Sequence, residues 1–155
     1  MYQKILITTD GSAVSRHTAC AGVEFARQMG ANVLVLYVAP TYQYPIYVEI
    51  VAPSYPSEED YLAQMQRLGA EHTGAIVHAA TAAGLQSEAM TVFSDSPALK
   101  IVDVAQQQKC DLIFMGSHGR SGWGHLLLGS VTNKVLSHTS KPVLVHRLIG
   151  EPATS

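Results

Sequence analysis

The sequence predicts a single α/β domain in which a doubly wound, five-stranded parallel sheet is covered by four helices. Short apolar runs alternate with longer stretches of helical spacing along the 155 residues, which predicts parallel strands joined by right-handed crossovers. The run 32–39 is continuously apolar, as is typical of a strand covered on both faces. An apolar content of 47% lets a chain of this length bury a sizeable core.

Composition narrows the class of protein. Only 14% of the residues are charged, which excludes disorder over most of the length. A net charge of -2 argues against a nucleic-acid-binding surface. No apolar run reaches the length of a transmembrane helix, and the N-terminus does not resemble a signal peptide. Cys20 and Cys110 lack CxxC spacing, so we interpret both as buried side chains of a cytoplasmic protein.

The first part of the chain predicts two strands around one helix. Residues 4–10 form a short apolar strand that stops at Asp-Gly-Ser, a helix-start signal. Residues 12–29 carry apolar side chains at helical spacing, and Gly30 follows as the stop. The run 32–39 is the second strand.

The segment 40–56 interrupts the alternation of predicted strands and helices. Its prolines exclude a regular element, and its tyrosines carry large apolar surfaces with polar tips. We interpret it as a mobile lid or a surface for a protein partner, ordered chiefly by contacts outside its own stretch. These residues are Pro40, Pro45, Pro53 and Pro56, with Tyr42, Tyr44, Tyr47 and Tyr55.

The second part of the chain continues the alternation to the last strand. Ser57 opens a helix as the first residue of a capping box, and Ser96 precedes a proline at the first position of the next helix. The last strand begins with a proline, as an edge strand permits. The expected helices cover 57–84, 96–108 and 130–138, and the strands cover 87–93, 111–115 and 142–146. The domain is expected to span 1–149, followed by a flexible tail at 150–155.

Ligands of open α/β sheets bind beyond the carboxyl ends of the strands, where the strand order reverses. A glycine-rich stretch, 116–129, follows one such end. Gly116 and Gly119 allow backbone amides to approach an anion, and Gly129 and Ser130 offer N–H groups at the positive end of a helix. Hydroxyls of Ser130 and Thr132 could add donors. The stretch is neither a Walker A loop nor GxGxxG, so it predicts a phosphate cradle without a dinucleotide.

The spacing Gly116-x2-Gly119-x9-Gly129-Ser130 resembles the G-2x-G-9x-G(S/T) signature of the universal stress proteins. The resemblance extends over nearly the whole chain, through the segments ILITTDGS, VLVLYV, DLIFMGSHGRSG, LLGSVTNKVL and SKPVLVHR. It implies an adenine nucleotide alpha hydrolase-like fold with strand order 3-2-1-4-5. It also implies ATP as ligand, with Mg²⁺ held by the phosphates, and a homodimer that pairs through Val143, Leu144 and Val145.

The resemblance assigns site residues one by one. Thr9 and Asp10 should meet the adenine and ribose, Val38 the adenine edge, and Met115 the ribose. The triphosphate should lie against Gly116, Gly119, Gly129, Ser130, Val131 and Thr132. Arg120 is either a counter-charge to the phosphates or a solvated loop residue. Ser94 stands where many relatives have glycine, so the shape of that turn is expected to differ.

Catalytic chemistry is not indicated. No nucleophile–base–acid set stands out, and the sequence names no water-positioning group for ATP hydrolysis. His118 is interpreted as an exposed loop histidine rather than a general base, and no side-chain metal site is expected. The sequence therefore predicts a nucleotide-dependent regulatory or stress-response protein. A slow ATPase and a dimeric interaction module with a structural nucleotide are the alternatives, and the choice among ATP, AMP and cyclic nucleotides stays open.

Overall fold

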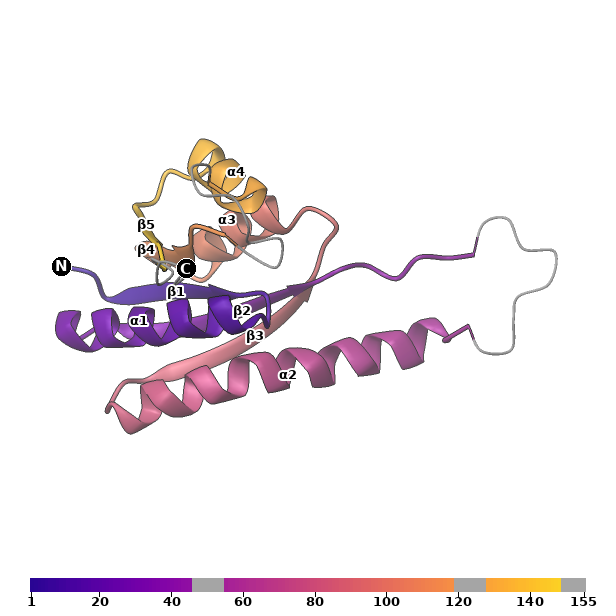
Figure 1. The fold of residues 1–155 in the computed structure, drawn as a ribbon, viewed down its shortest axis with the longest axis horizontal. Coiled ribbons are helices and arrows are strands. Elements are labelled where there is room, and N and C mark those ends of the chain that lie inside the picture. The colour runs from indigo at the N-terminus through magenta and orange to yellow at the C-terminus, as the bar shows by residue number, and fades with distance from the viewer. Residues whose placement is uncertain (46–54, 119–127, 149–155) are drawn as a thin grey trace, which may run out of the picture.

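The fold is a three-layer α/β sandwich, seen here in a computed structural model that describes residues 1–45, 55–118 and 128–148 (Figure 1). Five parallel strands run in the order β3-β2-β1-β4-β5. Helices α1 and α2 cover one face of the sheet, and α3 and α4 cover the other. The fold class predicted from the sequence, including the strand order, is confirmed.

The elements lie close to their predicted ranges. They are β1 (Lys4–Thr9), α1 (Ala13–Met29), β2 (Asn32–Ala39), α2 (Glu58–Ala82), β3 (Ser87–Phe93), α3 (Pro97–Gln107), β4 (Leu112–Gly116), α4 (Ser130–His138) and β5 (Val143–His146). Gly30 ends α1 in the left-handed conformation, at φ 65°. The hydroxyl of Ser57 accepts a hydrogen bond from the amide of Asp60 at the start of α2.

The core lies on both sides of the central strand β1. Ile5 and Ile7 face α1 and α2, whereas Leu6 faces α3 and α4, and all three side chains are fully buried. Successive side chains of a strand point to opposite faces, so a strand covered twice has no position left for a polar residue. This explains the uninterrupted apolar runs of the sequence.

One local prediction is confirmed in part and another is wrong. Ser96 precedes Pro97 at the start of α3, as predicted, but its side chain makes no capping hydrogen bond, and its amide donates to Ser94 Oγ over 3.0 Å. Cys20 is exposed because it lies on the solvent side of α1, next to the buried Ala19. Cys110 is buried as predicted, and this burial raises the pKa of its thiol to about 11.

The described ends of the segment 40–56 contact each other as well as residues outside the segment. The Tyr42 hydroxyl donates to the carbonyl of Pro56 over 2.8 Å, and that of Tyr55 donates to the carbonyl of Gln43. The Tyr42 and Tyr55 rings pack 6.1 Å apart. Contacts from outside add to these, since the Tyr61 hydroxyl donates to the carbonyl of Pro40.

Some predictions fall outside the described residues. Tyr47 and Pro53 lie in one gap, and the predicted tail lies in the C-terminal gap. Among the helices that the structure describes, none has the length and apolar character needed to cross a membrane.

Two glycines of α2 provide a matched test of how this helix packs on the sheet. A Cβ on Gly69 would lie 2.1 Å from Oγ1 of Thr91 in β3, whereas a Cβ on Gly74 would meet nothing within 4 Å. We expect Gly69→Ala to lower the free energy of unfolding by about 1–3 kcal/mol through overpacking. Gly74→Ala should raise it by roughly 0.5–1 kcal/mol through helix propensity. Urea unfolding checks both, and similar effects of the two substitutions would contradict this packing.

Candidate functional site

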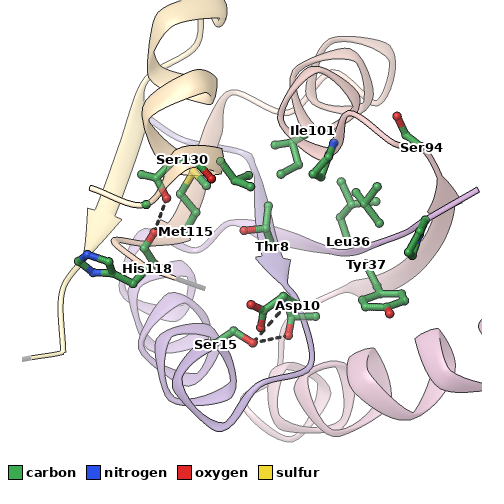
Figure 2. Close-up of a pocket in the computed structure, with 18 of the residues that line it drawn as sticks. Thr8, Asp10, Ser15, Leu36, Tyr37, Ser94, Ile101, Met115, His118 and Ser130 are labelled. Carbon is green, nitrogen blue, oxygen red and sulfur yellow. Dashed lines mark hydrogen bonds between the residues drawn. The ribbon is translucent and has the colours of Figure 1, made fainter. Parts of the chain in front are cut away.

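A pocket of about 500 Å³ opens at the carboxyl ends of β1, β2 and β4, where the strand order reverses (Figure 2). Nine of the residues predicted for the site line it: Thr9, Asp10, Val38, Met115, Gly116, Gly129, Ser130, Val131 and Thr132. The structure thus brings together residues from four separate parts of the chain. Gly119 and Arg120 lie outside the described residues.

The two sides of the pocket differ in chemistry. Leu36 and Ile101 lie on one side of the pocket in Figure 2. The apolar residues Val38, Pro40 and Pro97 also line the pocket. Ser130, at the start of α4, lies on the opposite side. The pocket therefore combines an apolar slot with a polar end, as small-molecule sites commonly do.

The polar end is built from the first turn of α4. The first hydrogen bond of this helix runs from the amide of Asn133 to the carbonyl of Gly129. The amides of Ser130, Val131 and Thr132 precede it and have no acceptor within the helix. Such amides, with the positive end of the helix dipole, suit an anion.

Internal hydrogen bonds hold this end in place. The amide of Gly129 donates to the carbonyl of Ser117 over 2.7 Å, and the hydroxyl of Thr132 donates to the carbonyl of Gly116 over 2.8 Å. The donor of Thr132 is thus used within the protein, and its side chain is only 3% exposed. Ser130, which is exposed, remains as the hydroxyl at the mouth of the polar end.

Gly116 is closely surrounded by protein atoms. A Cβ at this position would lie 3.1 Å from the carbonyl oxygen of His118 and 3.3 Å from Oγ1 of Thr18. A side chain here would therefore displace protein atoms. Within the described residues, the buried hydroxyl of Thr18 has no hydrogen-bond partner.

The loop between β1 and α1 also lines the pocket, through Asp10. Oγ of Ser15 lies 2.9 Å from Oγ1 of Thr9 and accepts a hydrogen bond from the amide of Asp10. Oδ1 of Asp10 accepts from the amide of Ser12 over 2.9 Å. This network fixes the backbone that carries the Asp10 carboxylate into the pocket.

The rim near Pro40 is tied to the turn after β3. The amide of Thr41 donates to Oδ1 of Asp95 over 3.0 Å, and its hydroxyl donates to the other carboxylate oxygen. These hydrogen bonds lower the pKa of Asp95 below its usual value, because they stabilise the charged form. The turn with Ser94, where the sequence departs from the family pattern, is thereby linked to the start of the tyrosine-rich segment.

The sequence did not indicate several lining residues. Ser15, Tyr37, Pro97 and Ile101 line the pocket from inside helices and strands rather than from the loops at their ends. Two of them could have been found from their neighbours, because Ser15 lies in the first turn of its helix and Tyr37 is adjacent to the predicted site residue Val38. His118 also lines the pocket, but its ring points away from the cavity (Figure 2), with Nδ1 3.1 Å from Oγ of Ser117.

Metal-ligating side chains do not gather in this part of the structure. Within residues 1–45, 55–118 and 128–148, no three side chains of histidine, cysteine, aspartate or glutamate are placed to hold a metal ion.

The fold and the pocket define a doubly wound α/β protein with a ligand site at its switch point. The model of the universal stress protein family matches residues 1–147, and the chain belongs to that family. Universal stress protein MJ0531 of Methanocaldococcus jannaschii is 32% identical over 150 residues, which cover 94% of this chain and 82% of that protein.

Solved structures share this architecture. Protein MJ0577 of the same organism matches with a TM-score of 0.78 at 24% identity, over 97% of this chain and 99% of that chain. A universal stress protein of Archaeoglobus fulgidus in complex with dAMP matches with a TM-score of 0.61 at 22% identity, over 93% of this chain and 97% of that chain. At these identities the likeness establishes the fold.

A substitution of Ser15 tests the hydrogen bonds that hold the loop between β1 and α1. Ser15→Ala removes the hydroxyl that joins Thr9, Asp10 and Ser12, and Ser15 is buried. We expect the free energy of unfolding to fall by about 1–3 kcal/mol, the cost of leaving buried polar groups unpaired. Ser137→Ala is the control, because this exposed hydroxyl bonds only its own helix, and it should stay within about 0.5 kcal/mol of wild type. Equal effects in urea unfolding would contradict the role given to Ser15.

Proposed function

We propose that this protein binds ATP with Mg²⁺ and acts as a nucleotide-dependent regulator in the stress response, in the cytoplasm. The proposal rests on one observation: the same pocket contains an apolar side and, at its polar end, the amides of the first turn of α4. A nucleotide has a flat apolar base at one end and phosphates at the other. Membership of the universal stress protein family and the dAMP complex of a relative support an adenine nucleotide.

The chemistry of the pocket suggests how the ligand lies. The base fits between Leu36 and Ile101, with the backbone of Val38 at its edge. The ribose lies near Thr9, Asp10 and Met115, and the phosphates meet the amides at the start of α4. Mg²⁺ neutralises phosphate charge and takes most of its ligands from the phosphates and water.

Regulation is favoured over fast hydrolysis. Hydrolysis needs a group that positions the attacking water near the γ-phosphate. The two carboxylates that line the pocket, Asp10 and Asp95, lie on the loop after β1 and the turn after β3, away from α4. The ring of His118 points away from the cavity. A slow ATPase is the second candidate, and a phosphate-release assay over many turnovers distinguishes it.

The identity of the nucleotide is tested directly. Mass spectrometry of the small molecules released from the denatured, freshly purified protein should detect an adenine nucleotide. Calorimetric titration with ATP, AMP and cyclic AMP then ranks the candidates.

We also propose a homodimer that pairs through β5. This strand is at the edge of the sheet, and Val143, Leu144 and Val145 are half-buried. An uncovered edge with apolar side chains favours pairing with another strand. Leu144 packs against the core on the α1 side, so backbone pairing rather than this side chain would form the contact.

The tyrosine-rich segment is proposed as a surface for a protein partner. Tyr44 is 64% exposed and Tyr55 is 40% exposed, although their rings belong to a cluster around Tyr42. Exposed tyrosines on an ordered support are common at protein interfaces. A hydrogen bond to Glu58, together with desolvation, raises the pKa of Tyr44, and desolvation raises the pKa of Tyr42.

Two substitutions of Ser130 test the proposed phosphate site at the start of α4. Ser130→Ala removes the hydroxyl and should weaken Mg-ATP binding by about 1 kcal/mol. Ser130→Pro also removes the first amide, and should weaken binding further. Proline is well tolerated at the first helical position, so the free energy of unfolding should remain near that of wild type. Calorimetric titration measures both, and wild-type affinity in Ser130→Pro would contradict the site.

Val145→Pro tests the dimer. The carbonyls of Pro142 and His146 accept hydrogen bonds from β4, so the alternate residues Val143 and Val145 point their amides away from the sheet. Proline at 145 therefore removes an outward donor and leaves the β4–β5 ladder intact. We expect light scattering to show a dimer for wild type and a monomer for the variant. A monomeric wild type would contradict the dimer, and a dimeric variant would contradict pairing through β5.

A further inference from the structure

His72, on α2, lies directly behind the loop that carries Asp10. A Cβ on Gly11 would lie 2.3 Å from Nε2 of His72, so the imidazole occupies the space that a side chain at position 11 would take. Gly11 has a φ of 81°, a left-handed conformation that glycine adopts without strain. The imidazole ring thus lies against one face of the turn.

The same ring contacts the wall of the pocket. His72 and Tyr37 pack edge to face, with ring centroids 5.1 Å apart. Tyr37 is only 3% exposed and lines the pocket, on the same side as Asp10 (Figure 2). One side chain of α2 therefore touches both the turn after Asp10 and the adjacent pocket wall.

The turn is held on its other face by hydrogen bonds. The amide of Gly11 donates to Oγ1 of Thr9 over 3.2 Å, and Thr9 bonds Ser15 at the start of α1. Gly11 thus lies between this network and the imidazole. Removal of the ring would leave room for the turn to move toward α2, and the Asp10 carboxylate would move with it.

We propose that His72 is a positioning residue for the sugar end of the pocket, which it serves by holding Gly11 and Tyr37 in place. The inference rests on the proposed binding of a nucleotide with its ribose near Asp10. A carboxylate held in place can accept a hydrogen bond from a ribose hydroxyl, and such bonds to charged groups are the stronger ones. Loss of the ring should therefore weaken the recognition of the ribose more than that of the base or phosphates.

The test compares ATP with 2′-deoxyATP and 3′-deoxyATP by calorimetric titration of the full chain. We expect wild type to bind at least one deoxy analogue roughly tenfold more weakly than ATP, the effect of one hydrogen bond to a charged group. His72→Ala should weaken ATP binding by a similar factor and leave that analogue almost unchanged, so that the discrimination disappears. His72→Phe, which keeps a planar ring against Gly11 and Tyr37, should retain it.

His78→Ala is the matched control, since His78 is exposed on the same helix, and it should bind as wild type does. Thermal unfolding of each variant shows that it is folded. The inference is overturned if wild type does not discriminate against either analogue, if His72→Ala keeps the discrimination, or if it weakens all three ligands equally. A wild type that binds none of the three overturns the proposed function itself, and the inference with it.

Discussion

The burial of β1 on both faces is the constraint on which the rest of the structure depends. Ile5, Leu6 and Ile7 are each fully buried, between α1 and α2 on one face and α3 and α4 on the other. No polar side chain fits into such a strand. Polar chemistry is therefore confined to the strand ends, and the loop at 10–12 carries the first polar residues after β1.

The candidate site follows from the backbone at those ends. The amides at the start of α4 lack acceptors within the helix, and the bond from Gly129 to Ser117 holds them beside the end of β4. Serine and threonine hydroxyls mostly serve this scaffold, as those of Ser15 and Thr132 show. Backbone amides occur in every protein and do not by themselves select a ligand. The selectivity of such a site for its ligand therefore depends on how accurately the backbone places these amides.

Helix α2 links two regions that are distant in the sequence. Tyr61, near its start, donates to the carbonyl of Pro40 at the pocket rim, and burial raises the pKa of this tyrosine. His72, three turns on, lies against Gly11. Helix α2 therefore contacts both the rim of the pocket and the loop that carries Asp10.

The sequence by itself determined the order and type of the elements, because apolar periodicity, the helix stop at Gly30 and the helix start at Ser57 are local properties of the chain. Topology indicated the strand ends where a site should lie, and the resemblance to the universal stress proteins named the individual residues, nine of which line the pocket. Only the tertiary structure decided which face of α1 is exposed at Cys20, that Gly116 lies close to His118 and Thr18, and that His72 meets Gly11. These contacts join elements that are separated along the chain, and they depend on how helices pack across the sheet, which no local pattern encodes.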